Sequence, residues 1–283
     1  MLIADLRFAI KSLGRSPGFT LIAIVTLGLG IGANTAGFSM FNGVLLKPLP
    51  YPDSAQLVRV YRVTTQNRDG HFSPADLLAF QRAMPGHGKV SAYTIASASL
   101  SEPGHPAEYT SAARGSANLF SLLGIRPQLG REFRPDEETP GRDRVVILSQ
   151  RAWNNRFGGQ PDVIGRTIRI DGEPHKVIGV MPETFNEWRH LGSVDIFRPL
   201  AFSPEQAADR SSTYLRILIR RAPGQSPAEL STFVANFGMQ LAADFPAVNA
   251  ESSWRADPLP SRLVPPAAPA MINTRRPMRS PMR

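Results

Sequence analysis

The chain has 283 residues, no cysteine and a formal net charge of +9. The lack of cysteine excludes disulfide bonds, cysteine-ligated zinc and thiol nucleophiles. A hydrophobic content of 42% with 19% charged residues excludes a wholly disordered chain. The charge is concentrated at the ends: residues 1–17 carry +2, residues 255–283 carry +5, and only +2 remains between them. Because phosphate binding needs basic side chains clustered on a folded surface, we expect no nucleic-acid partner.

The first 17 residues are typical of an amphipathic helix. Apolar side chains recur at helical spacing on one face, and the basic ones lie largely elsewhere: Leu2, Leu6, Ala9, Ile10 and Leu13 against Arg7, Lys11 and Arg15. We expect residues 1–17 to form an amphipathic helix at the membrane surface. The sequence Ser16-Pro17-Gly18 then indicates a turn.

Residues 18–46, "GFTLIAIVTLGLGIGANTAGFSMFNGVLL", contain no Asp, Glu, Lys, Arg or His. A helix of this length reaches about 40 Å, whereas the hydrocarbon core of a bilayer is about 30 Å thick. The run therefore predicts a transmembrane helix over 18–46. A buried core helix is less favoured because such helices rarely stay uncharged for so long. A cleaved signal peptide is also less favoured, because its apolar stretch is only about 7–15 residues long.

A stripe of small and polar residues lies within this run. Gly28, Gly32, Thr35, Ser39 and Asn42 follow one another at steps of four, three, four and three, which places them on one helix face. Small residues allow a second helix to approach closely, and hydroxyl or amide groups in lipid bond across helix interfaces. We interpret the stripe as a packing face for other transmembrane helices. The alternative is the ordinary glycine richness of membrane helices.

Residues 47–256 alternate between strand and helix patterns. Period-2 or β-rich runs predict strands at 57–63, around 107–116, after Asp143, and from 213 onward. Asp171-Gly172 between two strand patterns predicts a hairpin. Ser73-Pro74 and Ser226-Pro227 predict capped helix starts, and Gly124 predicts the end of a short helix. Strands and helices interspersed with a hairpin favour an α+β fold.

Several longer motifs carry a family resemblance. They are "PYPDSAQLVRVY", "SANLFSLLGIRPQLGREFRPDEE" and "RVVILSQRAWNNRFGGQPDVIGRTIRIDGEPHKVIGVMPETF". Together with the N-terminal helix they resemble the MacB/FtsX-type ABC transporter permeases, most closely the permease group common in acidobacteria. The resemblance covers roughly residues 1–260.

The resemblance implies an inner-membrane protein with a cytoplasmic N-terminus. It also implies one transmembrane helix followed by a two-lobed, MacB-like extracytoplasmic domain at 47–256. A partner ATPase subunit would bind the ATP, so we expect no cofactor on this chain. Further permease helices or copies would be partners, and motion driven by ATP hydrolysis would serve export or mechanotransmission outside the membrane.

The end of the chain departs from the family pattern. Residues 257–283 are rich in proline and arginine and show no periodicity, which predicts a disordered tail. Three more transmembrane helices would normally follow, so we expect a chain truncated before them; a purposeful basic tail is the alternative. Two functions remain open: a permease-subunit fragment, or a free-standing membrane-anchored module that binds an envelope protein.

The sequence carries no strong signal for catalysis. The five histidines show no H-x-x-x-H or H-E-x-x-H spacing, and no G-x-S-x-G or Walker A motif occurs. Asp136, Glu137 and Glu138 follow a proline and are interpreted as a solvated turn. Trp153 and Phe157, four apart on a predicted helix, are interpreted as core residues. We therefore expect no catalytic, metal or cofactor-binding residues, and the substrate or signal stays open.

Overall fold

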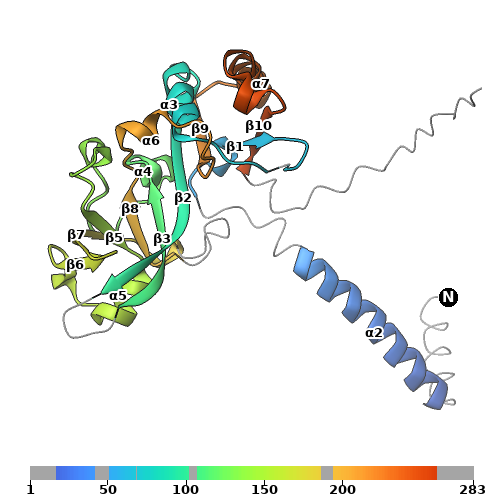
Figure 1. Ribbon diagram of the computed structural model, residues 1–283. Helices are drawn as coiled ribbons and strands as arrows, with labels where there is room; N and C mark the ends of the chain where they lie inside the picture. Colours follow the sequence, from blue (N-terminus) through green and yellow to red (C-terminus); the bar gives the residue numbers. More distant parts are fainter. Residues whose placement is uncertain (1–16, 42–50, 68, 102–106, 186–193, 260–283) are drawn as a thin grey trace, which may run out of the picture. The chain divides into compact units, whose positions relative to one another are not determined.

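The computed structural model describes residues 17–41, 51–67, 69–101, 107–185 and 194–259 (Figure 1). The chain divides into two compact units, one that includes helix α2 and one that spans residues 49–262. The strands are β1 (Leu57–Val63), β2 (Gly88–Ser101), β3 (Glu108–Gly115), β4 (Leu129–Gly130), β5 (Val145–Leu148), β6 (Thr167–Ile170), β7 (Glu173–Val180), β8 (Ile196–Pro199), β9 (Arg216–Arg221) and β10 (Ser253–Pro258). The α-helices are α2 (Pro17–Phe41), α3 (Pro74–Ala83), α4 (Leu119–Leu123), α5 (Gln150–Phe157), α6 (Pro204–Ala208), α7 (Pro227–Asp244) and α8 (Pro246–Asn249). Short 3₁₀ turns are η2 (Ser54–Gln56), η3 (Pro135–Glu138), η4 (Pro161–Val163) and η5 (Glu183–Phe185).

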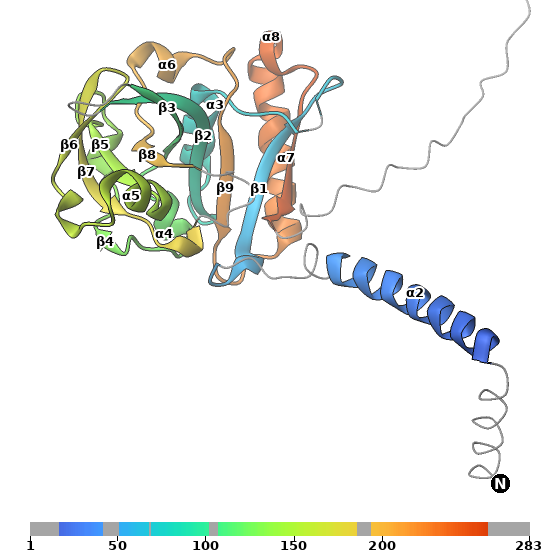
Figure 2. The ribbon, with the colours of Figure 1, turned by 90° about the horizontal axis from the view of Figure 1, so that it is seen from below.

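One end of the sheet forms a ferredoxin-like lobe. Its strands lie in the order β10-β1-β9-β2 and all pair antiparallel. In chain order this is β1-α3-β2 followed by β9-α7-β10, the split βαβ arrangement. Figure 2 shows α3 and α7 on the same face of these strands. That face holds a core that includes Val60, Phe80, Ile219, Val234 and Trp254.

A second lobe is inserted between β2 and β9. The inserted lobe continues the sheet through β3, β8, β5, β7 and β4, with β6 paired to β2 and β7. The long strand β2 belongs to both lobes: its first half pairs with β9, and its second half, from Tyr93 to Leu100, pairs with β3. One further core, around Val146 and Val177, lies in the inserted lobe. Another, around Phe120 of α4, also includes Leu57 of β1 and Leu218 of β9. A shared strand and a shared core therefore join the two lobes.

Local sequence signals account for several element boundaries. Ser73 and Ser226 each accept a hydrogen bond from the backbone N–H three residues later, at Asp76 and Glu229. Asp171 and Gly172 both have positive φ, as a two-residue turn matched to the twist of β6 and β7 requires. The structure confirms these predicted helix starts and this turn, and it confirms the α+β class with two lobes. It also confirms the predicted strands β1, β3, β5 and β9.

Other elements were not predicted. The pattern of the sequence indicated none of the strands β2, β8 and β10. Strand β10 extends to Pro258, and Leu259 is buried, so the fold continues into the range expected to be tail. The rest of that range, 260–283, lies outside the described residues, as do residues 1–16 of the surface helix predicted at 1–17.

Helix α2 confirms the helical part of the prediction for residues 18–46, whose last five residues lie outside the described part. Its large apolar side chains are exposed, with 51–68% of their surface accessible: Leu21, Ile22, Ile24, Val25, Leu27, Leu29 and Ile31. Nevertheless, among the residues that the structure describes, no helix combines the length and apolar character needed to cross a membrane.

Candidate functional site

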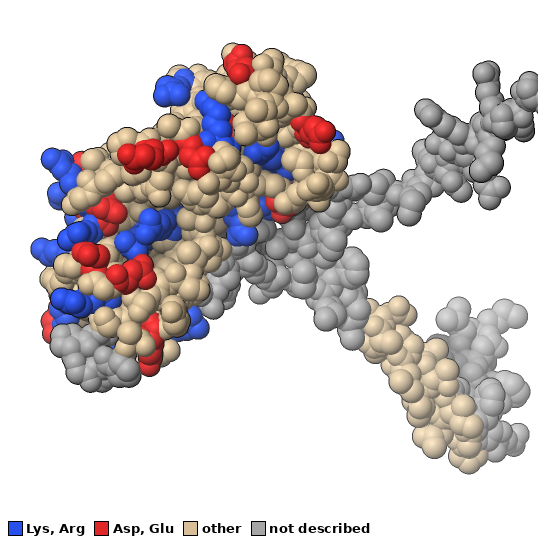
Figure 3. Space-filling model, in the orientation of Figure 1, with Lys and Arg blue, Asp and Glu red and all other residues tan. Residues whose placement is uncertain are grey.

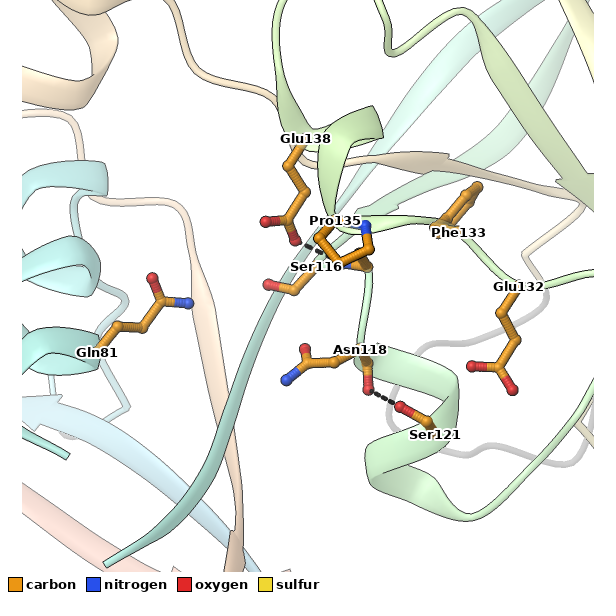
Figure 4. Close-up of a pocket in the computed structure, with 9 residues that line it drawn as sticks. Gln81, Ser116, Asn118, Ser121, Glu132, Phe133, Pro135 and Glu138 are labelled. Carbon is orange, nitrogen blue, oxygen red and sulfur yellow. Dashed lines mark hydrogen bonds between the residues drawn. The ribbon is translucent and has the colours of Figure 1, made fainter. Parts of the chain in front are cut away.

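A pocket of about 390 Å³ lies where the two lobes meet. Gln81 comes from α3 in the ferredoxin-like lobe, and the other lining residues come from α4, η3 and the segments before them. They are Ser116, Ala117, Asn118, Ser121, Glu132, Phe133, Pro135 and Glu138. Figure 4 shows the side chains of Gln81, Asn118 and Glu138 facing a common space, whereas Glu132 lies on the other side of α4. The pocket is therefore assembled from segments more than 30 residues apart in the sequence.

Hydrogen bonds to the backbone position the polar groups of the pocket. Glu138 Oε1 accepts the backbone N–H of Ala117 at 2.5 Å. Asn118 Nδ2 donates to the carbonyl oxygen of Val90 on β2 at 2.8 Å, which ties α4 to the shared strand. Ser121 Oγ donates to the carbonyl of Asn118 at 3.0 Å. These contacts hold the start of α4 against both β2 and η3.

The pocket is acidic. Its lining includes two carboxyl groups and no Lys, Arg or His. Burial raises the pKa of Glu138, partly offset by the hydrogen bond from Ala117. Burial likewise raises the pKa of Glu132, offset by the Arg126 charge and the Ser121 backbone. Such a lining favours hydrogen-bond donors and cations over anions, since an anion would meet the Glu138 carboxyl group without a basic partner among the lining residues.

The hydroxyl groups of the lining are hydrogen-bonded to backbone atoms. Ser116 Oγ accepts the backbone N–H of Ala92 at 3.0 Å, and Ser121 Oγ donates to a carbonyl. A serine nucleophile needs a general base within hydrogen-bond reach. In the contacts that the structure describes, these two hydroxyl groups meet backbone atoms rather than a general base.

The acidic run Asp136-Glu137-Glu138 differs from its sequence interpretation as a solvated turn. Glu137 is only 6% exposed and forms a two-pronged ion pair with Arg131, at 2.6 and 3.0 Å. It also accepts the backbone N–H of Arg134 at 2.8 Å. Glu138 lines the pocket, and only Asp136 matches the solvated interpretation, with 54% of its side chain exposed. Proline at the first position of η3 with Glu137 at the third was a detectable capping signal.

A second pocket, of about 330 Å³, lies beside β7 in the inserted lobe. Its lining includes two basic side chains, Arg131 and Lys176, among apolar residues such as Ile164 and Val177. Arg131 is already paired with Glu137. The basic residues of this pocket distinguish it from the acidic first pocket. Because the Arg131 charge is compensated by Glu137, the pocket is less positive than its two basic residues alone would indicate.

The residues predicted to form a helix-packing face lie in or near α2. Gly28, Gly32 and Thr35 are exposed, and a Cβ atom added at either glycine would meet nothing within 4 Å. The side chain of Ser39 and the whole of Asn42 lie outside the described residues. The packing face therefore stays a prediction.

The described histidines have ordinary structural contacts. His71 Nε2 accepts from Arg216 Nε at 3.2 Å, and the His87 ring stacks on Phe233 at 4.1 Å between centroids. His175 is buried, with its Nδ1 2.9 Å from the Glu173 carbonyl oxygen, and burial lowers its pKa. In the described part of the chain, no cluster of three or more His, Cys, Asp or Glu residues has the arrangement of a metal site.

Comparisons with known proteins show which family model and which solved structures match this architecture. The family model for the MacB-like periplasmic core domain matches residues 20–235. A search of curated proteins found no match.

Among solved structures, a domain of a predicted permease protein from Porphyromonas gingivalis aligns with a TM-score of 0.56 at 16% identity, covering 74% of this chain and 92% of that one. The periplasmic region of MacB from Actinobacillus actinomycetemcomitans gives 0.55 at 13%, covering 72% and 89%. The extracellular domain of the noncanonic ABC-type transporter YknZ from Gram-positive bacteria gives 0.53 at 15%, covering 71% and 99%. At these identities the three structures establish the shared fold alone.

Proposed function

Because the chain belongs to the MacB-like periplasmic core domain family, we propose that it is a permease subunit of a MacB/FtsX-type ABC transporter. In this proposal residues 51–259 form the extracytoplasmic domain. ATP is bound and hydrolysed by a separate ATPase subunit, and the resulting motion is used for export or mechanotransmission outside the membrane. The family match over residues 20–235 is the observation that carries the proposal.

The proposal includes a membrane anchor near the N-terminus and a cytoplasmic N-terminus. It rests on the whole uncharged run 18–46 rather than on the described helix alone. The exposed apolar side chains of α2 also favour it, because a contiguous apolar surface on a chain in water marks a partner or membrane contact. Figure 3 shows this helix without Lys, Arg, Asp or Glu, whereas charges of both signs are mixed over the visible face of the domain.

The proposed role is binding and transmission of motion, without catalysis on this chain. The acidic pocket supports this part, because the described hydrogen bonds of Ser116, Ser121 and Glu138 all join their side chains to backbone atoms. The pocket also lies where the lobes meet, so a change in the angle between them would change its shape. Substrates or signals with exposed hydrogen-bond donors fit its lining better than anions.

Crosslinking in membranes followed by purification tests the partner. The tagged full-length chain is expressed in its native host, and captured proteins are identified by mass spectrometry. We expect a protein with a Walker A motif, the P-loop that binds ATP. Capture of an envelope protein without any such ATPase would contradict the permease proposal and favour a free-standing anchored module.

The same capture tests the predicted packing face. Gly28→Leu and Gly32→Leu should reduce the yield of partner membrane proteins several-fold while the chain still fractionates with membranes. Gly30→Leu is the matched control, because two residues along a helix turn it away from the stripe by about 200°. Equal capture by all three variants would show that the stripe is not a packing face.

A further inference from the structure

Four buried polar side chains gather inside the ferredoxin-like lobe. Arg62 on β1, Asp76 on α3, Asn249 on α8 and Trp254 on β10 are 7%, 0%, 1% and 2% exposed. They come from four separate elements on the helix-covered side of the sheet. None belongs to the acidic pocket, and the proposed transport role does not use them.

Contacts between these elements bring the side chains together. Arg62 and Trp254 lie directly opposite each other in the pairing of β1 with β10, which places both on one face of the sheet. Arg62 Nη2 donates to the carbonyl oxygen of Val248 at 3.0 Å, next to Asn249. The Asp76 charge acts on Arg62, where it opposes the lowering of the Arg62 pKa by burial.

A second guanidinium group, that of Arg210, also contacts this cluster. Arg210, on the segment that returns from the inserted lobe, forms an ion pair with Asp76. The same guanidinium lies 3.6 Å from the centre of the Phe245 ring. Phe245 begins α8, and its carbonyl accepts the backbone N–H of Asn249 at 3.1 Å. The two arginines therefore flank α8, and each interacts with Asp76.

Five polar atoms of this cluster have no hydrogen-bond partner although they are shielded from solvent. They are Arg62 Nε, Asp76 Oδ2, Asn249 Oδ1, Asn249 Nδ2 and Trp254 Nε1. A buried polar group left without a partner has lost its hydrogen bonds to water without replacing them, which costs free energy. Five orphan atoms in one cluster would cost several times that, which a marginally stable fold does not tolerate easily.

We propose that the cluster is a binding site for ordered internal water. Water fits because the orphan atoms include both donors and acceptors, and one water molecule typically bonds to about three such groups. An anion would meet the Asp76 carboxylate, and a cation would meet the guanidinium groups of Arg62 and Arg210. The water connects β1, α3, α8 and β10. It lies beside the ion pair between Arg210 and Asp76, which links α3 to the segment that follows the inserted lobe.

A high-resolution crystal structure of the full-length chain, with a second crystal soaked in bromide, tests the site. We expect electron density at hydrogen-bonding distance from at least two of the five orphan atoms and no anomalous bromide signal there. A bromide peak at the cluster would overturn the proposal, because it would identify an anion site. A dry cluster, or side chains that bond directly to one another, would overturn it as well.

Magnetic relaxation dispersion of water oxygen in solution counts long-lived internal waters without a crystal. Asn249→Leu removes two of the orphan atoms, and we expect it to lower the count by at least one. Asn236→Leu, at an exposed position of α7, is the matched control and should leave the count unchanged. Equal counts in the wild type and a folded Asn249→Leu variant would contradict a water bound at Asn249.

Discussion

The contact between α7 and Trp254 allows a prediction in which two opposing effects can be separated. Gly238 is buried on α7, and a Cβ atom added there would lie 2.8, 2.8 and 2.9 Å from Cβ, Cγ and Cδ1 of Trp254. Gly238→Ala improves helix propensity by about 1 kcal/mol. It also overpacks the core, at a typical cost of about 1–3 kcal/mol.

The surroundings of Trp254 decide which effect is larger. Its ring lies 4.2 Å from Phe72, 5.3 Å from Phe237 and 5.5 Å from Phe80 between centroids. The indole cannot move away from a new methyl group without displacing these rings, so the cost should lie in the upper part of its range. We expect Gly238→Ala to lower the free energy of unfolding by about 1–2 kcal/mol, or Tm by about 2–8 °C.

Urea unfolding of the full-length chain, followed by tryptophan fluorescence and circular dichroism, measures this change. Ala235→Gly provides the matched reference, because Ala235 is exposed on the same helix and its loss reports propensity alone, about 1 kcal/mol. The steric cost is then the sum of the two measured losses. Stabilisation by Gly238→Ala of about 1 kcal/mol would refute the packing described here.

Three further variants test buried polar groups in the inserted lobe. Glu137→Ala should destabilise by about 2 kcal/mol because Arg131 loses a two-pronged charged partner, whereas Asp136→Ala, at a solvated position, should stay within about 0.5 kcal/mol in the same unfolding assay. Burial raises the pKa of Glu138, so the stability that its protonated carboxyl group contributes is lost as pH rises above the ordinary pKa of 4.5. The Glu138→Gln variant should therefore have a higher Tm than the wild type at pH 8 and lose that advantage towards pH 4. Burial lowers the pKa of His175, so stability is lost as pH falls below its ordinary value of 6.5, and His175→Phe should flatten the fall in Tm from pH 7 to 5. Parallel pH profiles for wild type and variant would contradict either pH prediction.

Local signals in the sequence predicted much of the fold because they act within a few residues. Ser73 and Ser226 bond to groups three positions away, and Asp171-Gly172 defines its own turn. Strand β2 was not predicted in this way. Its second half pairs with β3, the next strand along the chain, but its first half pairs with β9, more than 120 positions away. Strand β10 likewise depends on its pairing with β1 across about 190 residues.

The candidate pocket escaped sequence analysis for the same reason. Gln81 and Glu138 are 57 positions apart and share no motif, so only the meeting of the lobes places them together. The acidic run around Glu137 was interpreted from composition, which favours a solvated turn. Its burial follows from Arg131, whose guanidinium compensates the charge. The predicted stripe on α2 concerns contacts with transmembrane helices of partner proteins. The structure of one chain does not test such contacts.

Cysteine labelling in cells tests the central claim most directly, because the chain has no native cysteine to interfere. A single cysteine replaces Tyr109, whose side chain is 87% exposed on the domain, or Ser12 in the N-terminal segment. Spheroplasts are treated with a membrane-impermeant maleimide before or after lysis. We predict that Tyr109→Cys is labelled in intact spheroplasts and Ser12→Cys only after lysis. Labelling of Tyr109→Cys only after lysis would contradict an extracytoplasmic domain.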